Sequence, residues 1–334
     1  MKKISVAING FGRIGRVSLR ALLQHPHLSV AAINDLAPLQ TAAHLFKYDS
    51  TYGPFEGEVT HRDDCLVIDE CVIPFYSEAD PQRLPWKALQ IDVVLESTGV
   101  FTSQSKASQH IQAGAHQVVL SAPSTDPDVP TVVLGVNEHV LTTMPSVLSN
   151  ASCTTHCLAP MAMVLEKEFG IVCGQLTTTH AYTADQRLQD SSHKDLRRAR
   201  AAAHSIIPTS TGAARAIGRV LPTLEGKLSG MAMRVPVING SVTDLTVLLK
   251  KAVSTEAINE AMQAASKGCL RGVMAYTEDP IVSVDVIGNP HACVFDAQLT
   301  SVQGNLAKVV GWYDNEGAYA QRMVALIDRV AGSH

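Results

Sequence analysis

The sequence predicts an α/β protein in which a doubly wound, mostly parallel sheet is followed by an α+β domain with a large mixed or antiparallel sheet. In the first half, short apolar runs alternate with segments whose apolar residues recur at helical spacing, which is the pattern of a parallel sheet with helical connections. After Asn150 the apolar runs become longer and partly alternate in polarity, as antiparallel strands do when one face is covered. The length of 334 residues suits two domains.

The expected domain boundary follows from this change of pattern, because no low-complexity linker marks it. We expect one domain over residues 1–150 and a second over residues 151–314. A C-terminal helix is expected over residues 315–334, packed back on the first domain. No internal repeat is visible in the sequence.

The first domain opens with a strand, a glycine-rich turn, a helix and a second strand. Ile4–Ile8 is an apolar, β-branched run, Val17–His25 has helical spacing, and Leu28–Asp35 is a second apolar run. Further strands are predicted at Asp92–Thr98, His116–Pro123, Thr131–Asn137 and Ser146–Asn150, with a helix at Lys106–Ala115 and an inserted hairpin at Asp64–Tyr76.

The turn after the first strand contains Gly10, Gly12 and Gly15 in G-x-G-x-x-G register. One glycine permits the tight turn, one lets the backbone approach a pyrophosphate, and one lets the helix pack on the strand. Asp35 ends the second strand, where its carboxylate can bind an adenosine ribose and repel a 2′-phosphate. A turn with only a structural role would not require the flanking strands, the helix and Asp35, so we favour a Rossmann-type site for NAD. Its expected residues are Gly10, Phe11, Gly12, Arg13, Ile14, Gly15, Asp35, Thr98, Gly99 and Ser121, the last three because they follow strand C-termini.

Charge and cysteine content exclude several classes of protein. The formal net charge of −4 provides no basic field for nucleic acid, so any anion site must be local. We expect no signal peptide, and no apolar run is long enough to predict a membrane span. Seven scattered cysteines make a disulfide framework improbable, and a reducing cytoplasm is expected.

The stretch "NASCTTHC" (Asn150–Cys157) combines two cysteines with a histidine. Ser152 is expected to cap a helix that ends at Gly170, which places Cys153 in the first turn, where the helix dipole favours a thiolate. Cys157 lies one turn deeper and suits core packing. A metal site would normally have four ligands, and a redox pair is usually C-x-x-C, so we expect no metal and favour a nucleophilic Cys153.

A base and a set of anion donors follow in the second half. His180 ends the apolar strand "QLTTTH" and could act as the base, although a lone histidine there is more often structural. Arg234 lies inside the apolar run "MAMRVPV", where it must find partners or an anion. Thr183 and Asp185 follow His180. Further donors are the cluster Arg197, Arg198 and Arg200, and the residues Thr209–Gly212 before another predicted helix. Together, the dinucleotide domain, the cysteine, the histidine and the anion donors predict a hydride-transfer enzyme. Such an enzyme would act on a phosphorylated aldehyde through a thioester.

With these residues in place, the sequence resembles the glyceraldehyde-3-phosphate dehydrogenase family over essentially its whole length. The segments that carry the resemblance are "AINGFGRIGR", "AINDLA", "FKYDSTYG", "SNASCTTHCLAP", "HAYTADQRLQD", "HKDLRRARAAAHSIIPTSTGAA", "GMAMRVPV" and "WYDNE". The resemblance implies phosphorylating oxidation of glyceraldehyde 3-phosphate to 1,3-bisphosphoglycerate with NAD, in glycolysis or gluconeogenesis. It also implies a cytoplasmic homotetramer, because the stretch from Tyr182 to about Ala203 matches the family's loop that reaches a neighbouring subunit's cofactor.

The resemblance assigns a role to each site residue. It implies Cys153 as nucleophile, His180 as base and Asn315 as partner of the nicotinamide carboxamide. Thr183, Asp185 and Arg234 are implied for the substrate phosphate, and Ser152, Thr154, Arg198, Thr211 and Gly212 for inorganic phosphate.

Four positions depart from the family pattern: His156 for asparagine, Ser191-Ser192 for Leu-Pro, Ala79 for arginine, and Gly317-Ala318 for an aromatic residue and glycine. The serines resemble members that also accept NADP, whereas Asp35 and Ala79 indicate NAD. We therefore expect NAD, with NADP use possible. His156 is either a tolerated replacement or a charge that lowers the pKa of Cys153. Alternative functions are erythrose-4-phosphate dehydrogenase, which typically has Glu at the Asp35 position, and a non-catalytic binding protein on the same fold.

Overall fold

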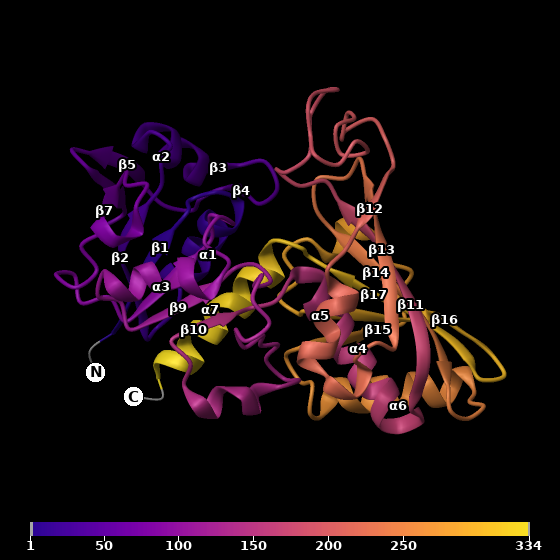
Figure 1. Cartoon of the computed structure of the whole chain (residues 1–334). Coiled ribbons are helices and arrows are strands. Elements are labelled where there is room, and N and C mark those ends of the chain that lie inside the picture. The colour runs from indigo at the N-terminus through magenta and orange to yellow at the C-terminus, as the bar shows by residue number, and fades with distance from the viewer. Residues whose placement is uncertain (1–2, 333–334) are drawn as a thin grey trace. The chain divides into compact units, whose positions relative to one another are not determined.

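The chain divides into two units, drawn in Figure 1, and the computed structural model describes residues 3–332. The first unit contains the chain up to Val132, His139–Ala151 and the segment from Ala320 onward. The second unit contains Val133–Glu138 and Ser152–Tyr319. Each unit has its own sheet.

The first unit is built on an eight-stranded sheet with the order β10-β9-β8-β1-β2-β7-β6-β5. The strands are β1 (Ile4–Asn9), β2 (Leu28–Asn34), β5 (Val59–Arg62), β6 (Cys65–Ile68), β7 (Cys71–Tyr76), β8 (Val93–Glu96), β9 (Gln117–Leu120) and β10 (Val147–Ser149). From β10 to β7 all neighbours are parallel, and β7, β6 and β5 pair antiparallel. The predicted hairpin is therefore present, and its second strand joins the parallel sheet. A separate two-stranded ribbon consists of β3 (Tyr48–Asp49) and β4 (Gly53–Pro54).

The helices of the first unit supply the apolar cover that a doubly wound sheet requires. They are α1 (Arg13–Leu23), α2 (Leu39–Lys47), α3 (Gln104–Gln112) and most of α7 (Gly317–Ala331), with short 3₁₀ segments at Pro81–Arg83 and Glu138–Thr143. Val94 of β8 and Leu120 of β9 are fully buried in a core that also contains Trp86 and Ala107 of α3. The Rossmann-type part of the predicted fold is confirmed.

The strand predicted at Thr131–Asn137 is wrong. Thr131 forms only an isolated bridge with Ser149, and the chain then turns. The side-chain oxygen of Asn137 accepts a hydrogen bond from the backbone N–H of Val133 at 2.8 Å, and Gly135 has a φ of +87°. The apolar run is buried in a turn that this asparagine stabilises, so its hydrophobicity does not reflect strand pairing.

The second unit is built on a seven-stranded mixed sheet with the order β12-β13-β11-β14-β17-β16-β15. Its strands are β11 (Ile171–Ala181), β12 (Ile207–Ser210), β13 (Leu228–Val235), β14 (Ser241–Leu249), β15 (Met274–Thr277), β16 (Cys293–Gln303) and β17 (Leu306–Tyr313). Two neighbouring pairs, β11 with β13 and β15 with β16, are parallel and the others are antiparallel. The predicted large mixed sheet is thus confirmed.

Helix α4 (Cys153–Phe169) lies against this sheet, with α5 (Ala213–Val220) and α6 (Thr255–Lys267) packed beside it. Ser152 is its N-cap, because its hydroxyl accepts from the backbone N–H of Thr155 at 3.2 Å. Gly170 ends the helix with a φ of +71°. Residues Thr154–Ala162 of the helix are all buried, which fixes the position of its N-terminal half. Within residues 3–332, no helix combines the length and hydrophobicity that a membrane crossing requires.

Candidate active site

A cavity of about 350 Å³ opens in the first unit at the C-terminal ends of β1, β2 and β8. Among the residues predicted for a dinucleotide, its lining contains Gly10, Gly12, Asp35 and Thr98. The carboxyl ends of parallel strands are where ligands bind in doubly wound sheets. Residues that the sequence analysis did not select complete the lining: Asn9, Asn34, Leu36, Glu78, Ala79, Pro81, Ser97, Val100 and Phe101.

The three glycines of the turn have three different surroundings. Gly10 has a φ of +94°, and a Cβ there would come within 2.6 Å of the backbone nitrogen of Thr98. At Gly15 a Cβ would lie 2.1 Å from the carbonyl oxygen of Gly10. A Cβ added to Gly12 would have no atom within 4 Å, so the backbone of Gly12 faces open space beside the cavity. This arrangement fits a pyrophosphate that approaches Gly12 at the start of α1.

Asp35 is held at the mouth of the cavity by two backbone donors. Its carboxylate accepts from the N–H of Phe11 at 2.5 Å and from the N–H of Ala37 at 2.8 Å. Glu78 lines the same cavity, and Ala79 adds no positive charge. Two carboxylates without a cation oppose a 2′-phosphate, so the lining fits NAD better than NADP.

Seven other predicted cofactor residues do not line this cavity: Phe11, Arg13, Ile14, Gly15, Gly99, Ser121 and, in the second unit, Asn315. The ring of Phe11 is buried against Phe46, and Arg13 forms an ion pair with Asp49 at 2.5 Å. The side chains of Phe11 and Arg13 thus make contacts within the first unit outside the cavity.

A buried carboxylate organises the floor of the cavity. Glu96 accepts hydrogen bonds from the side chain of Asn9 at 2.5 Å, from the backbone of Thr98 at 2.8 Å, and from His110 at 3.1 Å. The other ring nitrogen of His110 lies 3.0 Å from the indole nitrogen of Trp86, which can only donate. The Nδ1 of His110 is therefore an acceptor, and its Nε2–H donates to Glu96. Sequence reasoning missed this network because its members are scattered among apolar runs.

In the second unit, the residues predicted as nucleophile and base come together. The Sγ of Cys153, in the first turn of α4, lies 3.4 Å from the Nε2 of His180, at the end of β11. The parallel pairing of β11 with β13 places Arg234 opposite His180, and its Nη1 lies 2.5 Å from Nδ1 of the ring. Thiol, imidazole and guanidinium thus form one contiguous row.

Burial sets the protonation of this pair. Burial raises the pKa of the Cys153 thiol to about 11, although the charge of Arg234 and hydrogen bonds from Thr154 act in the opposite direction. Burial also lowers the pKa of His180 to about 3, and the charge of Arg234 lowers it further. At neutral pH the pair is therefore a thiol beside a neutral imidazole. The raised pKa of Cys153 runs against the thiolate expected from the helix dipole, because burial disfavours the charged form.

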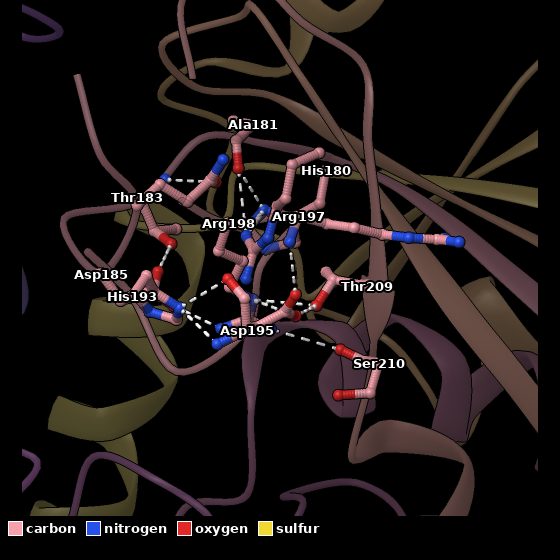
Figure 2. Close-up of polar contacts among 12 residues, drawn as sticks. His180, Ala181, Thr183, Asp185, His193, Asp195, Arg197, Arg198, Thr209 and Ser210 are labelled. Atoms are coloured by element: carbon pink, nitrogen blue, oxygen red, sulfur yellow. Dashed lines mark hydrogen bonds and ion pairs between the residues drawn. The ribbon is translucent and has the colours of Figure 1, made fainter. Parts of the chain in front are cut away.

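Three of the residues predicted for phosphate, Thr183, Asp185 and Arg198, form one polar cluster (Figure 2), and the charge of Arg234 acts on it. Arg198 pairs with Asp185, which also accepts from the hydroxyl of Thr183. Burial would raise the pKa of Asp185, but Thr183 and the charges of Arg198 and Arg234 outweigh it and keep that pKa below its usual value. Asp185 is therefore ionised at neutral pH, and Asp195, with its Oδ2 at 3.6 Å from Nε of Arg198, adds a second carboxylate beside the two guanidinium groups.

The second anchor of Arg198 is Thr209, a donor that the sequence analysis noted. Its hydroxyl accepts from the Nε of Arg198 at 2.9 Å and donates to Asp195 at 2.8 Å (Figure 2). Thr211 and Gly212 follow directly and lead into α5, where Gly212 is the N-cap with open space around it. Arg198 and the start of α5 are thus linked through β12.

Two other predicted residues are fixed by buried contacts. The side-chain oxygen of Asn315 accepts from the hydroxyl of Ser241 at 2.8 Å, which orients the amide. The hydroxyl of Thr154 lies 2.9 Å from that of Tyr313. Tyr313 is a functional candidate that sequence reasoning missed, because it reads as an ordinary strand residue. Its ring also packs edge-on to His180 with centroids 6.0 Å apart.

His156 and Cys157 are both buried in α4. The ring of His156 packs edge-on to Tyr319 at 5.7 Å, and the groups that shift the pKa of Cys153 are Arg234, Thr154 and Cys157. This favours His156 as a tolerated replacement for asparagine that packs in the core, over a charge that lowers the pKa of Cys153. All seven cysteines, each within the described part of the chain, are free thiols. Residues 3–332 contain no group of three or more potential metal ligands.

A cavity suited to a dinucleotide, together with a cysteine beside a histidine, is typical of an oxidoreductase. Comparison with known proteins identifies the family. A model of the glyceraldehyde 3-phosphate dehydrogenase NAD binding domain matches residues 4–104, and a model of the C-terminal domain of the same enzyme matches residues 152–315.

Full-length relatives agree with these matches. The chain is 53% identical over 327 residues to glyceraldehyde-3-phosphate dehydrogenase of Streptomyces coelicolor, with 97% of each chain covered. It is 52% identical over 337 residues to the enzyme of that name from Mycobacterium tuberculosis, with 99% of each covered. The chain belongs to the glyceraldehyde-3-phosphate dehydrogenase family and is an NAD-dependent enzyme.

Proposed function

We propose that this protein catalyses the phosphorylating oxidation of glyceraldehyde 3-phosphate to 1,3-bisphosphoglycerate in glycolysis or gluconeogenesis, with Cys153 as nucleophile and His180 as base. The observation that carries this proposal is the 3.4 Å approach of Sγ of Cys153 to Nε2 of His180, beside the guanidinium of Arg234. A thiol, a base and a fixed cation are the groups that attack on a phosphorylated aldehyde requires.

The first-unit cavity is proposed to hold the cofactor. Gly12 and the start of α1 would bind the pyrophosphate, Asp35 the adenosine ribose, and Asn315 the nicotinamide carboxamide. When bound, NAD accepts a hydride from the substrate carbon. The open space at Gly12 and the two carboxylates of the lining support this assignment.

The chain's own groups would perform the chemistry in sequence. The sulfur of Cys153 bonds to the aldehyde carbon and the carbonyl becomes a hydroxyl, giving a thiohemiacetal. His180 removes the hydroxyl proton as the carbon loses its hydride, which leaves a thioester on Cys153. Backbone N–H groups at the start of α4 stabilise the negative oxygen. Inorganic phosphate then attacks the thioester carbon, and the C–S bond breaks to release the acyl phosphate and the thiol.

Two anion sites are assigned to the two phosphates. Thr183, Asp185 and Arg234 are proposed for the substrate phosphate, whose charge the two arginines of the cluster complement. Ser152, Thr154, Arg198, Thr211 and Gly212 are proposed for inorganic phosphate. Arg198 donates hydrogen bonds to Thr209 and to the carbonyl of Ser210, and these two residues of β12 precede Thr211 in the chain. This contact supports a shared site for the five residues.

The proposed domain limits are residues 1–150, with the C-terminal helix, for the cofactor and 151–314 for catalysis. We further propose a cytoplasmic homotetramer. Exposed apolar side chains on the loop between β11 and β12, namely Leu188, Leu196 and Ile206, support burial against another copy. Light scattering on the purified protein measures the oligomeric state, and a monomer would contradict this assignment.

The activity is tested by following NADH formation with glyceraldehyde 3-phosphate and with erythrose 4-phosphate, each with and without inorganic phosphate. We expect fast, phosphate-dependent turnover of glyceraldehyde 3-phosphate. Preference for erythrose 4-phosphate, or turnover that does not depend on phosphate, would contradict the proposal.

A further inference from the structure

One buried serine joins the strand end that carries His180 to the residue assigned to the nicotinamide carboxamide. Ser241 begins β14 and is 1% exposed. Its Oγ accepts a hydrogen bond from the backbone N–H of Ala181 at 3.1 Å. The same Oγ lies 2.8 Å from Oδ1 of Asn315, so a single hydroxyl contacts both groups.

The directions of these two hydrogen bonds follow from the number of protons. The backbone N–H of Ala181 can only donate, so Oγ of Ser241 is its acceptor. The one hydroxyl proton of Ser241 is then available for Asn315, and no other group among residues 3–332 accepts it. If Nδ2 of Asn315 faced Ser241 instead, both neighbours would donate and the buried hydroxyl proton would have no acceptor, which is unfavourable. The amide is therefore held with Oδ1 toward Ser241.

This orientation leaves the other end of the amide with a free donor. Asn315 is 5% exposed, and within residues 3–332 its Nδ2 has no hydrogen-bond acceptor. Nor is Nδ2 one of the fully enclosed polar atoms that lack a partner in this part of the chain, so a ligand can reach it. An N–H donor in this position fits a carbonyl oxygen, which the carboxamide of nicotinamide offers.

The backbone on either side of Asn315 is fixed as well. Oδ1 of Asp314 accepts from Nδ2 of Asn239 at 2.8 Å and from two backbone N–H groups that follow Asn315 in the chain. Asn239 precedes Ser241 by two residues, so one short segment holds both the backbone and the side chain of Asn315. The free donor is thus fixed in place before any ligand binds.

We propose that Ser241 is a positioning residue for the cofactor: by holding Oδ1 of Asn315, it presents Nδ2 to the carbonyl oxygen of the nicotinamide carboxamide. This inference rests on the proposed function, because it deepens the role assigned there to Asn315. Both hydrogen bonds of the Ser241 hydroxyl are made within the protein, so Ser241 acts through Asn315.

The consequence is that Asn315 recognises the carbonyl oxygen of the carboxamide and not its NH₂ group. Without the hydroxyl of Ser241, Oδ1 of Asn315 loses its donor and the amide is free to turn over. The turned amide would present an oxygen to the carbonyl oxygen of the ligand, and two acceptors repel. Loss of Ser241 should therefore weaken cofactor binding only where Asn315 is present.

A double-mutant cycle tests this coupling. The dissociation constant of NAD is measured by titration calorimetry for the wild type, Ser241→Ala, Asn315→Ala and the double variant. We expect each single substitution to weaken NAD binding by ~5–10-fold, about the worth of one hydrogen bond. In the Asn315→Ala background, Ser241→Ala should change the affinity by less than about twofold. Two losses that multiply in the double variant would overturn the proposal.

A cofactor analogue tests the direction of the Asn315 hydrogen bond without any change at Ser241. In the 3-acetylpyridine analogue of NAD, a methyl group replaces NH₂ and the carbonyl oxygen remains. We expect Asn315→Ala to weaken binding of NAD and of the analogue by the same factor, within about twofold. If only NAD lost affinity, Asn315 would be accepting from NH₂, which would overturn the proposal.

Thr243→Val is the matched control, because it removes a buried hydroxyl from the same strand that does not contact Asn315. It should bind NAD as the wild type does. Weaker binding by Asn315→Ala without an effect of Ser241→Ala would overturn the role of Ser241 alone. Unchanged binding by Asn315→Ala would contradict both the role assigned to Asn315 and the inference that rests on it. Neither titration requires turnover, so each result is independent of the proposed reaction.

Discussion

The Sγ of Cys153 and the Nε2 of His180 lie 3.4 Å apart, although they belong to different elements, the first turn of α4 and the end of β11. The thiol has a raised pKa and the imidazole a lowered one, so both are neutral at pH 7. Proton transfer during the reaction, and not a preformed ion pair, therefore links the two groups.

Replacing the base tests this link. His180→Asn should slow NADH formation by ~10²–10⁴-fold, the usual worth of general-base catalysis. Iodoacetamide should still alkylate Cys153, because the thiol remains in place. The exposed His139 provides a matched control, since His139→Asn should leave turnover unchanged. Near-normal turnover of His180→Asn would remove this residue from the mechanism.

The hydroxyl of Tyr313 is expected to support the Cys153 thiolate through Thr154. Thr178 donates to the carbonyl of Val242, so it must accept from Tyr313, which in turn accepts from Thr154. When the sulfur ionises, the Thr154 hydroxyl can turn to it and Tyr313 can donate to Thr154. Tyr313→Phe removes this second donor and should raise the pKa of Cys153 further.

Alkylation rate against pH measures this effect. Since the pKa of Cys153 is raised to about 11, the wild-type rate should climb about tenfold per pH unit from neutral pH to about pH 10. Tyr313→Phe should react ~2–10-fold more slowly at each pH, the worth of one net hydrogen bond. Tyr276→Phe, which removes only a surface contact to Glu278, should match the wild type. A plateau near pH 8 would show that the thiol is not desolvated as described.

Substitutions of two glycines in the turn should affect NAD binding and the stability of the fold separately. Gly12→Ala has room for its Cβ, so the melting temperature should hardly change, while NAD binding weakens because the methyl group occupies the approach to the backbone. Gly15→Ala places its Cβ against the Gly10 carbonyl and should destabilise the fold by ~1–3 kcal/mol. Calorimetry and NAD titration measure both effects, and equal NAD affinity for Gly12→Ala and wild type would argue against a pyrophosphate there.

The network around Glu96 should affect NAD affinity without affecting chemistry. His110→Leu removes a donor to a buried carboxylate that holds Thr98, which should weaken NAD binding about tenfold or more. His110→Gln can still accept from Trp86 and donate to Glu96, so it should retain most of the affinity. The rate at saturating NAD should be unchanged in both. If Gln and Leu behaved alike, the network would have only a packing role.

The sequence predicted most of the fold because its strands are strongly patterned. Strands β1, β2, β8, β9 and β10, the hairpin and the helix of Cys153 all lie where periodicity and glycine signals place them. Thr131–Asn137 failed because Asn137 closes a turn on Val133, and an apolar run alone does not distinguish a buried turn from a strand.

The site was predictable only where chemistry appears in local motifs. Cys153, with its capping serine, and the glycine turn can be read from neighbours in sequence. The contact of Arg234 with His180 depends on the register of β11 against β13, and the edge-on contact of Tyr313 with His180 depends on tertiary packing. Neither has a sequence signal, because burial decides which polar side chains meet.

The central claim is that Cys153 carries the reaction on a phosphorylated aldehyde. Single-turnover assays with glyceraldehyde 3-phosphate and NAD, followed by mass spectrometry of the acid-quenched protein, test it most directly. We predict that the wild type gains the mass of a phosphoglyceroyl group on the peptide that contains Cys153, that phosphate removes this group, and that Cys153→Ser forms neither the adduct nor NADH. NADH formation at wild-type rates by Cys153→Ser, or an adduct on another residue, would contradict the account.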